Sequence, residues 1–198
     1  MPSRAFLALT LPDPTRALLA DACAAFRAAA PGWIGQKWVA PGLLHLTMKF
    51  VGPLPDPAVP HVLEALRAEG LRHARFHLEV MDVRPVPSER RADMLWAHLA
   101  GEIESCEMLA SGFEGVLEEI LDLDRDARSF RPHITLARAR RPRGTPAAAL
   151  EAADDVLSDL ARTSARTMSV RSATLFASTL GPTGPRYDRL GEIPLLDR

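Results

Sequence analysis

Cysteine and long apolar runs are scarce in this sequence of 198 residues, and each scarcity excludes a class of protein. The two cysteines, Cys23 and Cys106, cannot build a disulfide framework and are too few for a structural zinc site. We therefore expect buried, inert thiols in a reducing cytoplasm. No stretch approaches the ~18 consecutive apolar residues of a membrane-spanning helix, so no membrane partner is expected. The short apolar run that ends at Pro12 lacks a small-residue cleavage site, which favours a first strand over a signal peptide.

The overall balance of the chain is that of an ordinary globular protein. Hydrophobic residues make up 47% and charged residues 25%, with a formal net charge of −1. A disordered chain would have fewer apolar residues and a larger net charge. The length suits one substantial core or two small lobes that share one. No low-complexity linker divides the chain, so we expect one two-lobed domain over residues 1–198.

Lysine is also scarce, because Lys37 and Lys49 are the only two and every other basic residue is arginine. Arginine carries a planar set of donors that suits phosphate. The segment 102–124 contains acids and no Lys or Arg, whereas one acid and seven arginines follow in residues 125–143. These arginines, called the arginine stripe below, are Arg125, Arg128, Arg131, Arg138, Arg140, Arg141 and Arg143. The stripe could attract a polyanion or could be a solvated loop, and the composition alone favours the loop.

Strand and helix patterns alternate along the chain. Asp13-Pro14, Asp56-Pro57 and Thr145-Pro146 each open a helical pattern, because a capping residue followed by proline favours a helix start. The helices expected span about 13–30, 57–70, 102–122 and 146–162. Strands are expected at 4–11, 37–39, 43–51, 74–84, 93–99, 130–138, 166–180 (as two) and 186–195. Several connections are too short for parallel crossovers, so the pattern predicts an α+β fold with mixed or antiparallel sheets.

Two of the expected strands carry the same motif, histidine-apolar-threonine-apolar. It reads His45-Leu-Thr47-Met in the first strand and His133-Ile-Thr135-Leu in the second. Because side chains alternate between the faces of a strand, each histidine shares a face with its threonine. A single copy would be typical of a polar residue in a strand. Two copies on matching strands indicate a functional site.

These side chains suit phosphoryl chemistry without a metal. One neutral imidazole can remove a proton from water while a second, protonated imidazole donates a proton to the departing oxygen. The hydroxyls of Thr47 and Thr135 can bind the non-bridging oxygens of the phosphate. Neither motif contains a carboxylate, so we expect no metal and no other cofactor.

Strict alternation also makes predictions about neighbouring residues. It places Lys49 beside His45 and Arg131 beside His133, as substrate-binding cations, and it places Phe50 in the core. Tyr187 is a candidate to line the site or to stack a base. The three tryptophans, Trp33, Trp38 and Trp96, are expected to pack in the core or between lobes. The remaining histidines, namely His61, His73, His77 and His98, have no threonine partner and are expected to be structural or solvated.

The motifs resemble those of the two-histidine (2H) phosphoesterases, and most closely the RNA 2′,3′-cyclic phosphodiesterases of the LigT/ThpR type, also called 2′-5′ RNA ligases. The resemblance covers nearly the whole chain. It includes 4–12, 44–52, Leu95-Trp96, 130–138, 175–180 and 184–187. One departure lies at residues 84–91, Arg-Pro-Val-Pro-Ser-Glu-Arg-Arg, where the family has a glycine and phenylalanine turn. We expect that segment to be a loop bordering the cleft.

The resemblance implies a bilobal α+β fold in which two mostly antiparallel sheets face a central cleft, with helices outside. It implies hydrolysis of RNA 2′,3′-cyclic phosphate ends to 2′-phosphates, and a reverse reaction that forms a 2′-5′ bond. Carried over by motif, His45 is the proton donor and His133 the proton acceptor. The residues alone do not distinguish these two roles.

Other functions stay open at this point. The chain could act on a small cyclic nucleotide or on a 2′-5′-linked oligonucleotide, or it could bind RNA ends without turnover. Both histidines and both threonines are intact, which argues against the last alternative. The partners expected are RNA ends or nucleoside 2′,3′-cyclic phosphates, and the chain is expected to act as a monomer in the cytoplasm.

Overall fold

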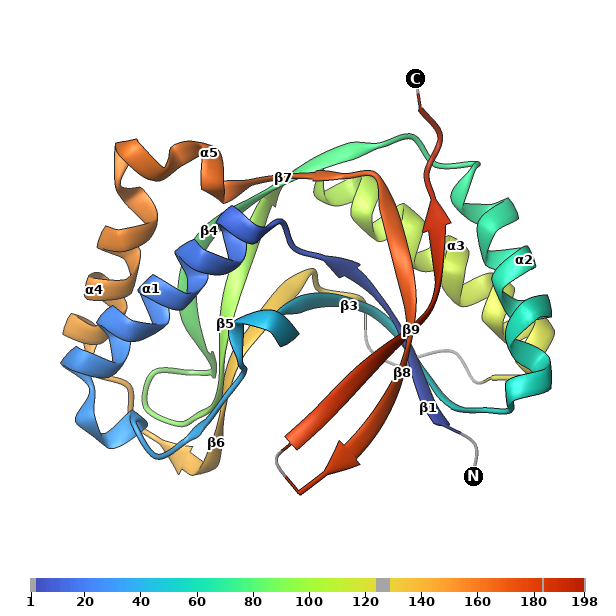
Figure 1. The fold of residues 1–198 in the computed structure, drawn as a ribbon. Helices are drawn as coiled ribbons and strands as arrows, with labels where there is room; N and C mark the ends of the chain where they lie inside the picture. The colour runs from blue at the N-terminus through green and yellow to red at the C-terminus, as the bar shows by residue number, and fades with distance from the viewer. Residues whose placement is uncertain (1–2, 124–128, 183, 198) are drawn as a thin grey trace.

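In the computed structural model, which describes residues 3–123, 129–182 and 184–197, one curled antiparallel sheet forms the centre of the molecule (Figure 1). Its strands run in the order β7-β4-β5-β6-β3-β1-β8-β9, and the short β2 pairs with β6. Their bounds are β1 Ser3–Thr10, β2 Lys37–Trp38, β3 His45–Leu54, β4 Phe76–Pro87, β5 Ala92–Gly101, β6 His133–Arg143, β7 Thr167–Val170, β8 Ser172–Gly181 and β9 Gly184–Pro194.

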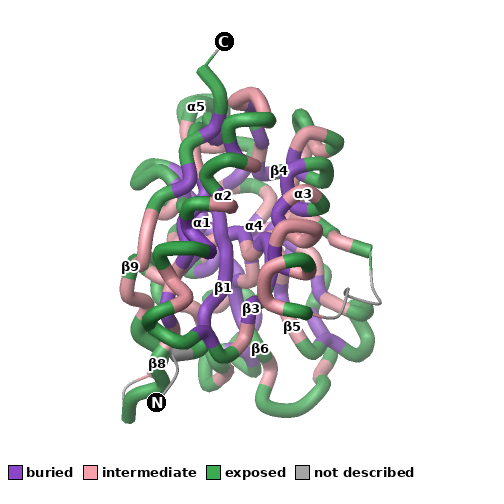
Figure 2. Tube along the Cα trace, turned by 90° about the vertical axis from the view of Figure 1, so that its right-hand side faces the viewer, coloured by how far each residue is buried: buried purple, intermediate pink, exposed green. Residues whose placement is uncertain are grey.

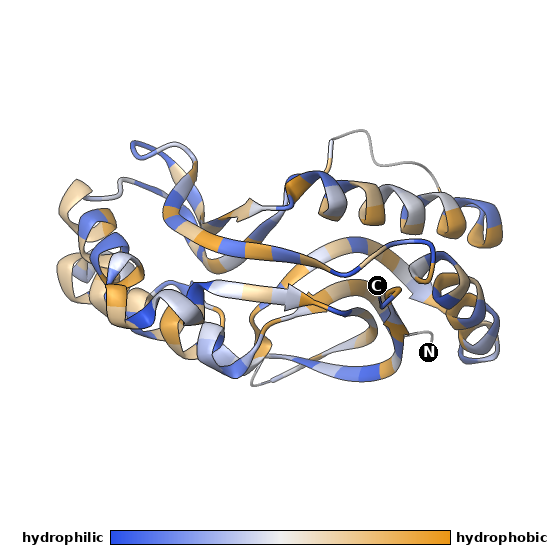
Figure 3. Cartoon of the chain, turned by 90° about the horizontal axis from the view of Figure 1, so that it is seen from above, coloured by the Kyte–Doolittle hydropathy of each residue, from blue (hydrophilic) through white to orange (hydrophobic). Residues whose placement is uncertain are grey.

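The α-helices of the described residues lie outside this sheet, in two groups (Figure 1). α1 (Asp13–Ala29) packs against α4 (Ala147–Ser158) and the short α5 (Thr163–Arg166), while α2 (Val59–Gly70) packs against α3 (Ile103–Leu121). Each group covers part of the sheet, since α4 contacts β4 and α3 contacts β3. In Figure 3, hydrophobic and hydrophilic residues alternate around these helices, which is typical of helices with one buried face.

The core lies between the sheet and the helices. β1 is buried along most of its length, because it pairs with β3 on one side and β8 on the other (Figure 2). Trp33 packs edge-on against Phe26 and Trp38. Cys23 and Cys106 are buried as expected, and burial raises the pKa of each thiol to about 12. Both thiols therefore stay protonated at neutral pH.

The α+β class is confirmed, and each expected strand and helix is found near its predicted position. The two sheets expected are joined into one, because Leu46 of β3 pairs with Ile134 of β6. This single pair connects the half-sheet β7-β4-β5-β6 to the half-sheet β3-β1-β8-β9. The two-lobed domain over residues 1–198 stays a prediction.

The segment 84–91 is only partly a loop. Residues 84–87 extend β4, where Arg84 pairs with Trp96 and Val86 with Met94 of β5. The sequence interpretation placed a loop over the whole segment, but the prolines at 85 and 87 both pair with residues of β5 in this hairpin. In the described residues, no helix is long and apolar enough to cross a membrane.

Candidate active site

The two motif strands lie side by side in the middle of the sheet (Figure 1). The residue between histidine and threonine in one motif, Leu46, pairs with its counterpart Ile134 in the other. Both of these apolar side chains are fully buried. Because neighbours along a strand point to opposite faces, each histidine and threonine faces away from that buried side. The pairing therefore brings both motifs to one face as an approximate two-fold repeat.

Each histidine ring is oriented by a backbone carbonyl group two residues earlier. His45 Nδ1 lies 2.7 Å from the carbonyl oxygen of Leu43, and His133 Nδ1 lies 2.7 Å from that of Arg131. A carbonyl oxygen only accepts, so Nδ1 carries the hydrogen in both neutral rings. Nε2 is then the nitrogen of each neutral ring that can accept a proton. His45 Nε2 lies 3.0 Å from Thr47 Oγ1, and the hydroxyl donates to it when the ring is neutral.

A β-bulge follows the threonine in each strand. On β3, Ala8 pairs with Thr47 and Leu7 with Lys49, which leaves Met48 as the extra residue. On β6, Trp96 pairs with Thr135 and Leu95 with Ala137, which leaves Leu136 extra. The alternation of faces therefore shifts by one residue after each threonine. The two strands share the same burial pattern over their first six residues.

The bulges decide which residues reach the site. Phe50, three residues after Thr47, is 69% exposed and lines the cavity, so its expected place in the core is wrong. Arg138, three residues after Thr135, also lines the cavity. Lys49 instead turns to the buried face, where it is 5% exposed and its Nζ lies 2.5 Å from Glu114 Oε1 on α3. The structure thus places Lys49 outside the lining of the histidine cavity.

Both motifs open into one cavity of about 420 Å³, within the usual range for small-molecule sites. The sequence-predicted residues that line this histidine cavity are His45, Thr47, His133, Thr135 and Tyr187. Residues that the sequence interpretation missed are Arg4, Phe6, Phe50, Arg138 and Ser178. The cavity therefore combines two imidazoles, hydroxyl groups, two arginines and an aromatic wall.

Aromatic side chains hold the two histidines in different ways. Trp96 of β5 stacks on the His133 ring, with centroids 3.6 Å apart and an angle of 18° between planes. Trp96, which was expected to pack in the core or between lobes, is half-buried and contacts this histidine. His45 instead meets Tyr187 edge-on, at 5.4 Å between centroids, and tilts against Phe6 at 5.1 Å.

The environment lowers the pKa of both imidazoles. Burial is the largest cause for His45 and for His133, because it disfavours the charged ring. The positive charge of Arg138 acts in the same direction on both, and His98 and His45 add to it at His133. The bonds to the carbonyl groups of Leu43 and Arg131 oppose these effects. Without substrate, the two rings therefore favour the neutral form near pH 7.

Arg131 was expected beside His133, but only its carbonyl group supports that ring. Its side chain is exposed and lines a neighbouring cavity instead. The regular strand begins at His133, so the alternation of faces does not extend back to residue 131. Of the arginine stripe, Arg138 reaches the histidine cavity and Arg143 lies over the Trp33 ring, whereas Arg125 and Arg128 fall outside the described residues.

Within the described residues, no three His, Cys, Asp or Glu side chains come together as a group that could hold a metal ion. The cavity can instead bind an anion through arginines and hydroxyl groups and move protons through two imidazoles. That set of groups defines a phosphoesterase site of the two-histidine class.

Comparison with known proteins places the chain in a family. The family model described as LigT like Phosphoesterase matches residues 9–96 and 111–187, so the chain belongs to this family, and the resemblance seen in the sequence is confirmed. The RNA 2′,3′-cyclic phosphodiesterase of Aeropyrum pernix is 25% identical over 160 residues, which cover 81% of this chain and 86% of that protein. The protein of the same name from Thermus thermophilus is 32% identical over 142 residues, 70% of each chain.

A solved structure shows the same fold. The crystal structure of TT0787 of Thermus thermophilus superposes with a TM-score of 0.76 at 28% identity, over 98% of this chain and 99% of that one. The described elements of the present chain thus have the architecture of this relative, and the α+β prediction agrees with it.

Proposed function

We propose that this phosphoesterase hydrolyses RNA 2′,3′-cyclic phosphate ends to 2′-phosphates, without a metal, by acid–base catalysis between His45 and His133. The observation that carries the proposal is the repeated geometry of the two rings. Each ring has Nδ1 fixed on a carbonyl oxygen and Nε2 left for proton transfer, and both rings line one cavity. The names of the relatives support the choice of substrate.

In the proposed reaction, Nε2 of neutral His133 takes a proton from a water molecule as its oxygen attacks phosphorus. The bond from phosphorus to the 3′-oxygen breaks, and protonated His45 donates its Nε2 proton to that oxygen. The product keeps the phosphate on the 2′-oxygen, and the two rings have exchanged protonation states. The assignment of donor and acceptor follows the resemblance of the motifs.

Other lining residues would stabilise the phosphate and hold the nucleoside. Thr47 and Thr135 lie beside the histidines, so their hydroxyls can donate to the non-bridging oxygens as negative charge builds there. Arg138 and Arg4 supply positive charge in the same cavity. Phe50, exposed at this cavity, offers a ring on which a base can stack, and Tyr187 extends the aromatic wall.

The same groups would support a reverse ligation. If the 5′-hydroxyl of a second RNA replaces water, its oxygen attacks phosphorus and the 3′-oxygen leaves, which forms a 2′-5′ bond. Hydrolysis should dominate in dilute solution, because water is far more concentrated than any RNA end. We further propose that a monomer is the active unit, since one chain supplies all the groups named above.

Incubation of the protein with a nucleoside 2′,3′-cyclic phosphate, and with a short RNA that carries the same end, tests the proposal in the presence of EDTA. Chromatography against 2′- and 3′-monophosphate standards identifies the product. We expect the 2′-phosphate from both substrates. Exclusive formation of the 3′-phosphate, or no turnover of either substrate, would contradict the proposed function.

A further inference from the structure

A second cavity, of about 580 Å³, adjoins the histidine cavity on the β5 side. The lining of this side cavity includes Pro85, Pro87, Trp96, His98, Glu107 and Arg131. They come from β4, β5, α3 and the segment before β6. None of these groups has a role in the proton transfers proposed above.

The two cavities meet at Trp96 and His133. The stacked Trp96 ring lines the side cavity, while the His133 ring beneath it lines the histidine cavity. His98 of β5 pairs directly with His133 of β6, and paired residues point to the same face of a sheet. A lining residue of the side cavity is therefore in direct ring contact with a lining residue of the histidine cavity.

The lining of the side cavity combines the groups that recognise a nucleotide. Arg131 is an exposed guanidinium, which binds phosphate through several donors. Trp96 and the two prolines present flat apolar surface against which a base can lie. The Glu107 carboxylate on α3 can accept hydrogen bonds from the amino group of a base.

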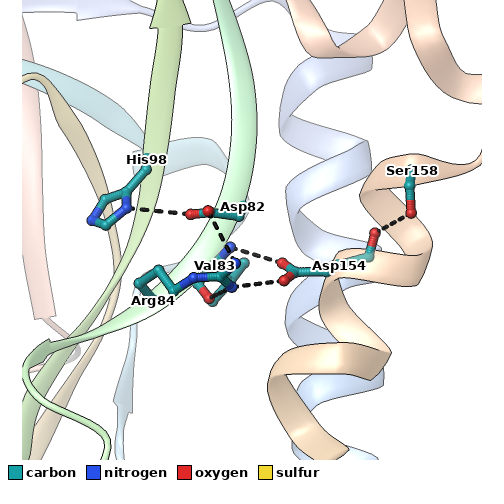
Figure 4. A network of polar contacts seen from close by, with 6 residues as sticks. All are labelled: Asp82, Val83, Arg84, His98, Asp154 and Ser158. Atoms are coloured by element: carbon teal, nitrogen blue, oxygen red, sulfur yellow. Dashed lines mark hydrogen bonds and ion pairs between the residues drawn. The ribbon is translucent and has the colours of Figure 1, made fainter. Parts of the chain in front are cut away.

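His98 lies at the end of a network of polar contacts that reaches α4 (Figure 4). His98 Nδ1 lies 3.2 Å from Asp82 Oδ1, which turns the Nε2 edge of the ring away from Asp82. Asp82 pairs with Arg84 at 3.1 Å, and Arg84 donates to Asp154 of α4 at 2.6 Å. The Nε2 edge of His98 therefore faces away from this network, on the side where the residue lines the side cavity.

We propose that the side cavity binds the second nucleotide of the substrate strand, the one on the 5′ side of the nucleotide that carries the cyclic phosphate. This inference rests on the proposed function and names the class of substrate, an oligonucleotide rather than a mononucleotide. The phosphate between the two nucleotides contacts Arg131 and His98, and the second base lies against Trp96. Consecutive nucleotides of one strand can reach both cavities because the cavities share a wall.

The test compares a nucleoside 2′,3′-cyclic phosphate with a dinucleotide that ends in the same cyclic phosphate. The ratio of their kcat/KM values is measured for the unmodified protein, for Arg131→Ala and for the control Arg72→Ala, an exposed arginine after α2 that lies outside the arginine stripe and lines neither cavity. A hydrogen bond to a charged group corresponds to roughly tenfold in binding. We expect the unmodified protein and Arg72→Ala to prefer the dinucleotide, and Arg131→Ala to lose about tenfold of that preference.

Three results would overturn the inference. The first is equal kcat/KM of the unmodified protein for both substrates, and the second is a change of both kcat/KM values by the same factor in Arg131→Ala. Alternatively, Arg131→Ala could leave dinucleotide hydrolysis intact and impair only ligation to a 5′-hydroxyl oligonucleotide, which would assign the side cavity to a second strand. Failure of the proposed function is a separate result, because the unmodified protein would then not hydrolyse even the mononucleotide.

Discussion

His45 and His133 each hold their Nδ1 hydrogen against a carbonyl oxygen at 2.7 Å, so both present the same ring nitrogen to substrate. The rings differ in their neighbours. His133 lies under Trp96, and His45 lies between Phe6 and Tyr187. The two histidines therefore share one ring orientation, and the proposed reaction gives them opposite roles in proton transfer.

Replacement of either histidine by alanine should remove most of the hydrolysis. General acid–base groups contribute ~10²–10⁴-fold each, so kcat on a 2′,3′-cyclic phosphate should fall by that order in His45→Ala and in His133→Ala. Because the pair acts as a unit, the double variant should lose far less than the product of the two single losses. A single variant that folds normally by circular dichroism and keeps near-normal kcat would refute the assignment.

Arg138 should control the pH at which the pair works. Its charge lowers the pKa of both histidines, so Arg138→Gln should raise both values. The pH profile of kcat/KM should then move to higher pH, along with a rise in KM from weaker phosphate binding. NMR titration of the imidazole protons checks the same shift without substrate, and Arg140→Gln serves as a matched control on the same strand. Unchanged imidazole pKa values in Arg138→Gln would refute this role.

At the scale of elements, two bulges shape the site. Met48 and Leu136 each add one residue after the motif threonine, and this shift turns Phe50 and Arg138 toward the cavity. The same shift turns Lys49 away from the cavity and into contact with Glu114 of α3. After the bulge, Phe50 on one face of β3 lines the histidine cavity, and Lys49 on the other face contacts α3.

Lys49 should accordingly matter for stability. Its side chain is nearly buried, and removal of one partner of a buried ion pair costs roughly 3 kcal/mol. Lys49→Met should lower the urea midpoint of unfolding accordingly, while KM for the cyclic phosphate stays within about twofold at a temperature where the variant is folded. A large rise in KM with unchanged stability would restore the sequence-based interpretation of Lys49 as a substrate-binding residue.

The sequence predicted the strands, the helices and the duplicated motif because these depend on local pattern. His45, Thr47, His133 and Thr135 meet in one cavity as expected, since the motif lies before each bulge. Lys49 and Phe50, which follow the bulge in β3, were assigned to the wrong faces, because strict alternation assumes a strand without an added residue. Phe50 and Arg138 each lie three residues after a motif threonine. This equal spacing indicates that both line the site only once the structure shows that each strand has a bulge at the same position.

Arg4 and Ser178 could not be predicted as site residues for a different reason. They face each other on β1 and β8, far from either motif in sequence, and reach the cavity only because β1 lies between β3 and β8. Strand order within a sheet is a tertiary property that the local pattern does not specify. The contact of Trp96 with His133 likewise depends on the pairing of β5 with β6.

At the scale of the whole molecule, charge is distributed unevenly around a nearly neutral chain. The arginine stripe leads along β6 into the histidine cavity at Arg138 and, at Arg131, into the side cavity. If the stripe guides RNA, log KM should rise with log salt more steeply for an oligonucleotide that ends in a cyclic phosphate than for the mononucleotide. Equal slopes for the two substrates would show that the stripe does not guide RNA and is only solvated surface.

The proposed two-histidine mechanism can be tested through the pH dependence of kcat/KM, measured in EDTA on a nucleoside 2′,3′-cyclic phosphate. Turnover needs one imidazole neutral and the other protonated, so the profile should be a bell whose limbs belong to the coupled pair. Both pKa values are lowered, so the maximum should lie on the acid side of the ordinary imidazole value of about 6.5. The profile of kcat should lie higher, because bound phosphate favours protonation. Activity that disappears in EDTA and returns with a divalent cation would contradict the account, since a metal-bound hydroxide would then be the nucleophile.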